Sequence, residues 1–198
     1  MQRGKTFIIS GPSGVGKSTV LKELLAKRSN LYFSVSATTR DPRPDEVDGV
    51  HYHFMDVNTF RSWIAKDEFL EYAEYVGNFY GTPKKFVDEA MNHGQDVILD
   101  IEVQGAIQVC SKRPDTVRIF IAPPSWEELE HRLTTRGTDS PDKVQKRLLR
   151  AKVEFQTAHT YDYFVINDTV ENAVRELEAI MTAEHCKPRE RMEIINSK

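Results

Sequence analysis

The chain of 198 residues has 39% hydrophobic and 29% charged residues and a formal net charge of −3, which is typical of a globular protein. This slight excess of acid argues against a polynucleotide partner, which would favour a basic surface, and no apolar run is long enough to span a bilayer. The length favours one core with inserted subdomains. Residues 1–5 lack a signal-peptide core, and the cysteines, Cys110 and Cys186, form no paired motif. We therefore expect a cytoplasmic protein without nucleic-acid or membrane partners.

A glycine-rich segment lies between a predicted buried strand, residues 6–10, and a predicted amphipathic helix, residues 19–27. It fits the Walker A pattern, in which glycines and a helix N-terminus cradle a phosphate chain. The matching residues are Gly11, Pro12, Ser13, Gly14, Val15, Gly16, Lys17 and Ser18, followed by Thr19. Lys17 is predicted to reach the β and γ oxygens, and the Ser18 hydroxyl is predicted to hold Mg²⁺. One alternative is a turn that merely connects a strand to a helix, but the full motif and both flanking elements favour the Walker A pattern. The other is a dinucleotide-binding fingerprint, whose glycine spacing the segment does not match.

Residues 36–52 place two arginines in a loop that two prolines interrupt. Arg40 and Arg43, three residues apart among hydroxyl groups, can hold a terminal phosphate through forked N–H donors, and Tyr52 can add an O–H donor. The alternative is that both arginines are solvated surface charges, where most arginines belong. The loop composition alone leaves the two interpretations open.

Residues 69–76 form a predicted strand in which Glu71 shares a face with Phe69, Ala73 and Tyr75. A carboxylate among apolar neighbours needs hydrogen-bond donors. Guanine offers two adjacent donors, N1–H and the exocyclic amine, whereas adenine offers neither at those positions, so such a pocket would reject adenine. Hydroxyls of Ser36 and Thr82 could complete the base contacts. The alternative is an exposed glutamate on an edge strand.

The remaining chain alternates predicted strands and helices, which indicates an α/β protein with a mostly parallel sheet. Thr82 and Pro83 are predicted to cap a helix that runs to His93. Residues 96–101 form a buried strand that ends near Asp100, at the edge where α/β sheets place chemistry. The other predicted elements are strands at 117–122 and 163–167 and helices at 125–133, 140–158 and 170–185.

Several motifs in order along residues 5–184 closely resemble the guanylate kinase family, among the P-loop NTPases. They are GPSGVGKST, SVSATTRDPRPDEVDGVHYHF, EFLEYAEYVGNFYGTP, ILDIEVQG, IFIAPPS, RLTTRGTD and VIND. This resemblance implies the reaction of ATP with GMP to give ADP and GDP, in purine nucleotide metabolism, with dGMP as a second acceptor and Mg²⁺ as the metal. It also implies a P-loop core at 1–33, 86–124 and 160–198, a β-rich GMP-binding insertion at 34–85 and a lid at 125–159.

The resemblance also assigns roles to residues that match the family motifs. Predicted GMP contacts are Ser36, Arg40, Arg43, Glu46, Tyr52, Glu71, Tyr80, Thr82 and Glu102. Predicted ATP contacts beyond the Walker A residues are Arg132, Arg136, Asn167 and Asp168. Lys17, Arg40, Arg136, Arg147 and Asp100 are predicted catalytic residues, and Ser18 and Asp100 are predicted to hold the metal.

Two positions depart from the family pattern: Asp45 replaces the glycine usual before Glu46, and Thr82 stands where some members have serine. Neither change removes a catalytic group. Two other functions stay open, a small kinase with another acceptor and a catalytically silent guanylate-kinase-like binding module. The second fits poorly because Gly16, Lys17 and Ser18 are intact. The sequence does not distinguish a monomer from a homodimer.

Overall fold

The computed structural model describes residues 3–135, 140–188 and 191–192, in two compact units. The first unit contains residues 3–8 and 30–117, and the second contains residues 9–29 and 118 onward.

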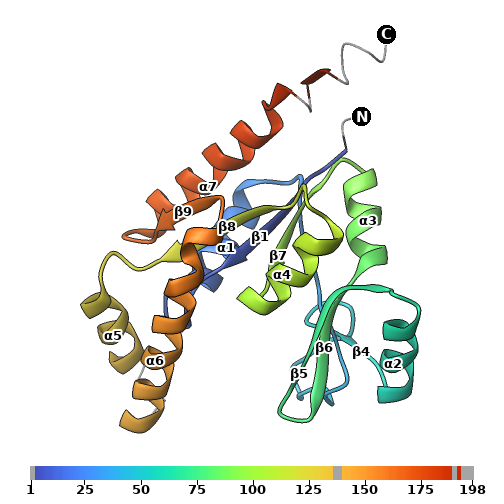
Figure 1. Ribbon diagram of the computed structural model, residues 1–198, viewed down its shortest axis with the longest axis horizontal. Helices are drawn as coiled ribbons and strands as arrows, with labels where there is room; N and C mark the ends of the chain where they lie inside the picture. Colours follow the sequence, from blue (N-terminus) through green and yellow to red (C-terminus); the bar gives the residue numbers. More distant parts are fainter. Residues whose placement is uncertain (1–2, 136–139, 189–190, 193–198) are drawn as a thin grey trace. The chain divides into compact units, whose positions relative to one another are not determined.

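A five-stranded sheet has the strand order β2-β7-β1-β8-β9, and Figure 1 labels all of these strands except β2. Its strands are β1 (Thr6–Ser10), β2 (Leu31–Phe33), β7 (Asp96–Asp100), β8 (Val117–Ala122) and β9 (Tyr163–Ile166). The pairs β2–β7 and β8–β9 are parallel, and every residue of β1 is buried. Parallel strands buried on both faces are expected to be nearly continuous apolar runs, as β1, β7 and β8 are. The predicted α/β class with a mostly parallel sheet is therefore confirmed.

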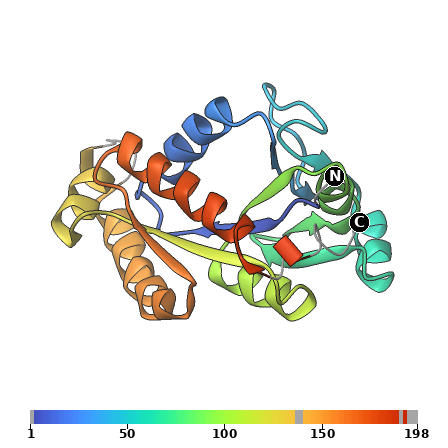
Figure 2. The same cartoon turned by 90° about the horizontal axis from the view of Figure 1, so that it is seen from above.

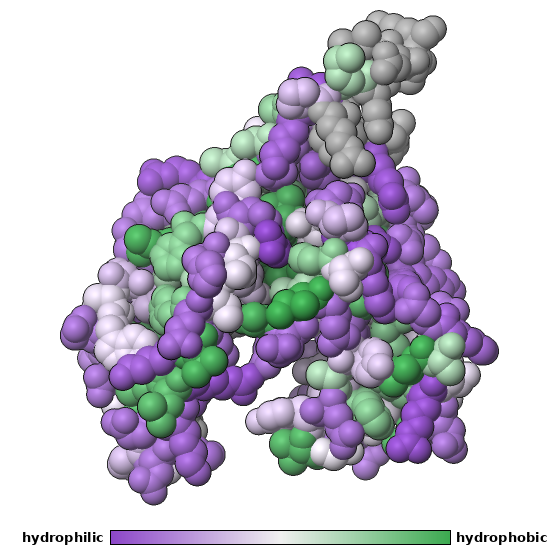
Figure 3. All heavy atoms as spheres, in the orientation of Figure 1, coloured by the Kyte–Doolittle hydropathy of each residue, from purple (hydrophilic) through white to green (hydrophobic). Residues whose placement is uncertain are grey.

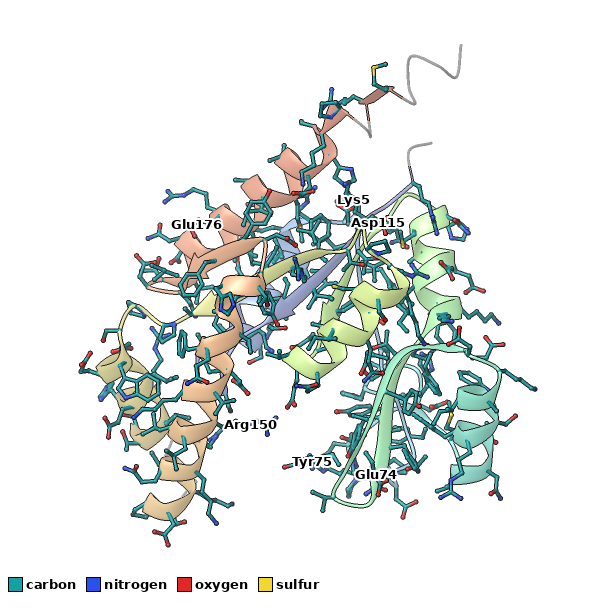
Figure 4. All side chains as sticks on the ribbon, in the orientation of Figure 1. Lys5, Glu74, Tyr75, Asp115, Arg150 and Glu176 are labelled. Atoms are coloured by element: carbon teal, nitrogen blue, oxygen red, sulfur yellow. The ribbon has the colours of Figure 1, made fainter. Side chains whose placement is uncertain are left out.

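The first unit contains a four-stranded sheet with the order β4-β3-β6-β5. Its strands are β3 (Ala37–Thr38), β4 (His53–Phe54), β5 (Phe69–Tyr75) and β6 (Asn78–Pro83). Helix α2 (Val57–Ala65) packs on it through Phe60, whose ring lies 4.3 Å from that of Phe69. Asp56 caps α2 by accepting hydrogen bonds from the N–H groups of Asn58 and Thr59. Figure 4 labels Glu74 and Tyr75 at the end of the β5–β6 hairpin.

Helices α3 (Lys84–Asn92) and α4 (Val103–Lys112) complete the core of the first unit. Val87 and Met91 of α3 and Val109 of α4 join Val97 of β7 and Leu70 of β5 in one buried cluster. Because Leu70 belongs to this cluster while its neighbour Phe69 packs in the small sheet, β5 is joined to both hydrophobic layers of the unit.

The second unit contains helices α1 (Lys17–Lys27), α5 (Trp126–Thr135), α6 (Pro141–Thr157) and α7 (Val170–His185), with a 3₁₀ turn at Ala158–Thr160. Helices α1 and α7 lie side by side, as Figure 2 shows. Helices α5 and α6 share an apolar cluster that includes Leu129, Leu133 and Leu148. The visible face in Figure 3 is mostly hydrophilic, with hydrophobic residues over α6, where Leu149 and Val153 are exposed. Within the described residues, no helix combines the length and apolar character that crossing a membrane requires.

Three local expectations were wrong. Thr82 and Pro83 do not begin a helix together but end β6, and Pro83 is the N-cap of α3. Alternation along β5 fails because a β-bulge between Phe69 and Glu71 shifts the register. As a result Phe69, Leu70 and Glu71 are all buried, whereas Ala73 and Tyr75 are exposed. Helix α4 was not predicted.

Candidate functional site

The P-loop connects β1 to α1 in the second unit. Gly14 and Gly16 have φ angles of 95° and 90°, which glycine adopts without strain. Gly16 is the N-cap of α1, and no side chain caps this end of the helix. The first-turn N–H groups and the positive end of the helix dipole therefore make a suitable phosphate site.

Two side chains hold the backbone of this loop. The Asn167 amide nitrogen donates to the Val15 carbonyl over 2.7 Å, and Arg132 Nη1 donates to the same carbonyl over 3.1 Å. Arg132 Nη2 also donates to the Asn167 carbonyl, and its Nε pairs with Glu128. A β-carbon on Gly16 would lie 2.6 Å from the Asn167 amide nitrogen, so the loop packs too closely for any other residue there. In this structure Arg132 and Asn167 act on the loop itself.

The other residues predicted around ATP lie in several parts of the second unit. Lys17 is partly buried at the start of α1, while Ser18 and Thr19 are exposed in its first turn. Arg147 of α6 donates a hydrogen bond to the Ser13 hydroxyl of the P-loop. The Asp168 carboxylate accepts hydrogen bonds from the Thr169 N–H and the Asn172 amide, and these bonds lower its pKa. The predicted catalytic residue Arg136 lies outside the described residues.

In the first unit, Arg40 and Glu46 form the centre of the predicted phosphate clamp. Arg40 Nη2 lies 2.8 Å from both carboxylate oxygens of Glu46, and Arg40 Nη1 donates to the Asp41 carbonyl. The Glu46 carboxylate also accepts from the Arg43 N–H over 2.9 Å. These bonds, from Arg43 first and Arg40 second, lower the pKa of Glu46, and the bond to Glu46 raises the pKa of Arg40. Glu46 therefore fixes the fork of Arg40 and the turn that carries Arg43.

Aromatic side chains surround the same guanidinium. Arg40 lies over the rings of Tyr52 and Phe54, at 5.4 Å and 5.9 Å from their centroids. Tyr80 contributes to the raised pKa of Arg40 and packs edge-on against Tyr52. The structure thus brings Arg40, Glu46, Tyr52 and Tyr80 together, with Arg43 in the adjoining turn.

The Glu71 carboxylate is buried, with an exposed fraction of 7% for the residue. Its Oε1 accepts a hydrogen bond of 2.6 Å from the hydroxyl of Thr82, which pairs with it across β5 and β6. Burial raises the pKa of Glu71, the bonds from Thr82 oppose that change, and the nearby Glu102 adds to it. A buried carboxylate with a single side-chain hydrogen-bond donor in the described residues is suited to a ligand that brings further donors.

The remaining predicted GMP residues belong to neighbouring elements of the first unit. Ser36 precedes Ala37, which pairs with Gly81, the residue before Thr82. Glu102 is the N-cap residue of α4, and its side chain makes no capping hydrogen bond. Asp100 is exposed at the end of β7, after four buried residues. The expectation that a carboxylate stands at the edge of the parallel sheet is confirmed by this position.

Sequence reasoning missed three contacts on Glu71 and its strand. They come from Gly105, Gln108 and Lys112 of α4. The apolar residues Ala106 and Val109 and the final Lys112 were available signals for a helix. The glycine near its start weakens that signal, because glycine disfavours helix interiors.

A family model described as guanylate kinase matches residues 3–184. A curated guanylate kinase of Thermus thermophilus is 54% identical over 182 residues, covering 92% of this chain and 82% of that protein. A guanylate kinase of Carboxydothermus hydrogenoformans is 50% identical over 189 residues, covering 96% of this chain and 93% of that protein.

The chain belongs to the guanylate kinase family. A solved guanylate kinase from Anaplasma phagocytophilum has the same fold, with a TM-score of 0.73 and 34% identity, and the match covers 94% of this chain and 89% of that one. The resemblance inferred from the motifs is confirmed, and the protein is an enzyme of the kinase class. The roles of individual residues and the bounds of the three predicted domains stay predictions.

Proposed function

We propose that this protein transfers the γ-phosphoryl group of ATP to GMP, giving ADP and GDP, with dGMP as a second acceptor. The observation that carries the choice of acceptor is the buried pair of Glu71 and Thr82, in the same unit as the Arg40 clamp. The P-loop supports ATP as the donor. We expect the protein to act in the cytoplasm, with no nucleic-acid or membrane partner.

Guanine fits the Glu71 site through its hydrogen bonds. Its N1–H and exocyclic amine point the same way, so both can donate hydrogen bonds to one carboxylate. The Thr82 hydroxyl already donates one hydrogen bond to Oε1. Ser36, the residue before β3, would add a further hydroxyl, and Glu102 would add a second carboxylate. Adenine would leave Glu71 buried without these donors, so it would be rejected.

The phosphate of GMP would bind Arg40, Arg43, Tyr52 and Tyr80. Glu46 holds the Arg40 guanidinium before any ligand arrives, which reduces the ordering that binding requires. A phosphate oxygen of GMP then attacks the γ-phosphorus, the bond from that phosphorus to the β,γ-bridging oxygen breaks, and ADP leaves with the electron pair. The acceptor is already anionic at neutral pH, so no general base is required.

The P-loop and its neighbours would bind ATP. The uncapped N-terminus of α1 faces the loop, so its N–H groups can receive the phosphate oxygens, with Lys17 as the positive charge beside them. Arg136 and Arg147 are the predicted lid arginines that stabilise charge during transfer. Mg²⁺ prefers hydroxyl, carboxylate and phosphate oxygens, which fits the exposed Ser18 hydroxyl and the exposed Asp100 carboxylate as its predicted protein ligands. When bound, the ion neutralises phosphate charge.

The experiment is ADP formation from ATP and Mg²⁺ with GMP, dGMP, AMP, CMP, UMP and dTMP as separate acceptors. We expect turnover with GMP and dGMP only, abolished by a chelator and restored by Mg²⁺. Lys17→Ala should lose activity, whereas Lys22→Ala, an exposed lysine on the same helix, should keep it. A folded protein that binds GMP but phosphorylates none of these acceptors would instead support the binding-module alternative.

A further inference from the structure

Three residues on one face of α4 contact strand β5. Gly105, Gln108 and Lys112 are spaced by three and four residues, so they lie on the same side of the helix. Helix α4 and β5 pack together within the first unit, and Figure 1 shows α4 beside the upper end of β5. We name this set the α4 face. No substrate role was predicted for any of the three residues.

Gln108 completes the outer edge of β5. Strand β5 is the last strand of the four-stranded sheet, so alternate peptide groups on its outer side have no strand partner. The Gln108 carboxamide supplies both missing bonds to one residue: its Oε1 accepts from the Tyr72 N–H over 3.2 Å, and its Nε2 donates to the Tyr72 carbonyl over 3.0 Å. Tyr72 directly follows Glu71, so this pair fixes the backbone on one side of the carboxylate.

Lys112 fixes the backbone on the other side. Its ammonium donates to the Phe69 carbonyl over 2.7 Å and pairs with Asp67 over 2.7 Å. Asp67 also pairs with Lys84, the first residue of α3. Phe69 and Glu71 flank the β-bulge, where an irregular backbone needs outside support to keep one geometry. Glu71 therefore lies between two anchors that both belong to α4.

Gly105 sets the place of the carboxylate. A β-carbon at this position would lie 3.0 Å from Glu71 Oε2 and 3.4 Å from its Cδ and Cγ atoms. The Glu71 side chain thus lies against the backbone of α4, and a β-carbon at this position would push the carboxylate away by a few tenths of an ångström. The same helix determines both where the strand lies and how far the carboxylate extends.

We propose that the α4 face positions Glu71 for guanine recognition and that Gln108 is the principal positioning residue. This inference rests on the proposed function. Without the carboxamide, the Tyr72 N–H and carbonyl would hydrogen-bond to water, and the strand would lose one of its two anchors. The Glu71 carboxylate would then no longer accept from both guanine donors at once. The second donor, the exocyclic amine, is absent from IMP, which keeps N1–H. Preference for GMP over IMP therefore reports on the position of Glu71.

The test measures KM and kcat for GMP, IMP and ATP in wild type and Gln108→Met, which keeps side-chain volume without the paired hydrogen bonds. We expect KM for GMP to rise about tenfold, which is about 1.4 kcal/mol of binding free energy, because a displaced carboxylate makes weaker hydrogen bonds to guanine. The GMP to IMP ratio of kcat/KM should fall by a similar factor, with KM for ATP unchanged. Ile107→Ala, an exposed neighbour on α4, is the matched control and should behave as wild type.

Two further variants separate positioning from general damage. In a Glu71→Gln background, Gln108→Met should change the GMP to IMP ratio no further, because its effect passes through Glu71. Gly105→Ala should lower the ratio in a protein whose thermal unfolding stays cooperative, whether or not Gln108→Met folds. An unchanged ratio in Gln108→Met and Gly105→Ala, or equal losses for GMP, IMP and ATP, would overturn the positioning role alone. Wild-type protein without GMP turnover would overturn both this role and the proposed function.

Discussion

Glu46 supports the predicted phosphate clamp by holding Arg40. Its carboxylate meets Arg40 Nη2 with both oxygens and also receives the Arg43 N–H. A carboxamide can accept from the guanidinium with one oxygen only, so Arg40 would lose its fixed orientation. We predict that Glu46→Gln raises KM for GMP several-fold with a smaller change in kcat, measured by steady-state kinetics. Asp45→Asn, the same charge change one residue away, is the control; equal KM values in both variants would contradict the role.

Glu71 also makes the stability of the protein depend on pH. Burial raises its pKa in the folded protein above the ordinary value, so folding favours the protonated carboxyl. Its contribution to the free energy of unfolding is therefore present at low pH and lost as pH rises through the raised pKa. Glutamine has the same shape without a charge. We predict that ligand-free Glu71→Gln unfolds a few degrees higher than wild type at pH 7, with the difference shrinking toward pH 4.

Thermal unfolding across this pH range checks that prediction. Glu74→Gln serves as control because Glu74 is exposed on the same strand. If Glu71→Gln were the less stable protein at pH 7, the buried carboxylate would be a stabilising group and its proposed need for guanine donors would be wrong. A variant with lower activity and higher stability is the result expected when a group needed for binding destabilises the ligand-free protein.

Helix α5 and the segment before α7 meet at the P-loop through one arginine. Arg132 donates to the Val15 and Asn167 carbonyls and pairs with Glu128, three contacts that need a planar fork. Lysine keeps the charge but cannot make these contacts together. We predict that Arg132→Lys raises KM for ATP several-fold and leaves KM for GMP unchanged, whereas Arg175→Lys, on the exposed side of α7, changes neither. An unchanged KM for ATP would show that the loop keeps its shape without this link.

Elements with strong local signals could be predicted from the sequence. The helix at Val170–His185 has its predicted bounds because Thr169 caps it and its apolar spacing is regular. Strand Val117–Ala122 is apolar except for Arg118 and also has its predicted bounds. Helix α4 was missed because Gly105 interrupts its helical pattern. A glycine at this position leaves space for the Glu71 side chain, which is distant in sequence.

The grouping of candidate site residues could be predicted where one segment carries them, as in the P-loop and the loop of Arg40, while their roles stay predictions. The buried position of Glu71 was expected, but the reason given for it was wrong. The expectation relied on alternating faces along the strand, and the β-bulge removes that alternation. The contacts of Gln108 with Tyr72 span 36 residues, and no local pattern encodes such a pair. Long-range side-chain bonds to backbone depend on packing, which single-sequence patterns do not specify.

At the scale of the whole molecule, the predicted acceptor residues and the P-loop belong to different compact units. Transfer without hydrolysis requires the acceptor oxygen to reach the γ-phosphorus while water is excluded. We therefore predict that the radius of gyration, measured by small-angle X-ray scattering, falls when GMP and a non-hydrolysable ATP analogue are added together. Each ligand alone should give a smaller change. An unaltered radius with both ligands bound would contradict closure.

We propose that a buried carboxylate selects guanine for phosphoryl transfer. The most direct test is the ratio of kcat/KM for GMP to that for AMP, in wild type and in Glu71→Gln of verified fold. Because the proposed site would hydrogen-bond groups that adenine lacks, we predict a wild-type ratio of about 10⁴ or more, with most of that preference lost in the variant. A wild type that phosphorylates AMP as well as GMP, or a variant that keeps the full ratio, would contradict the claim.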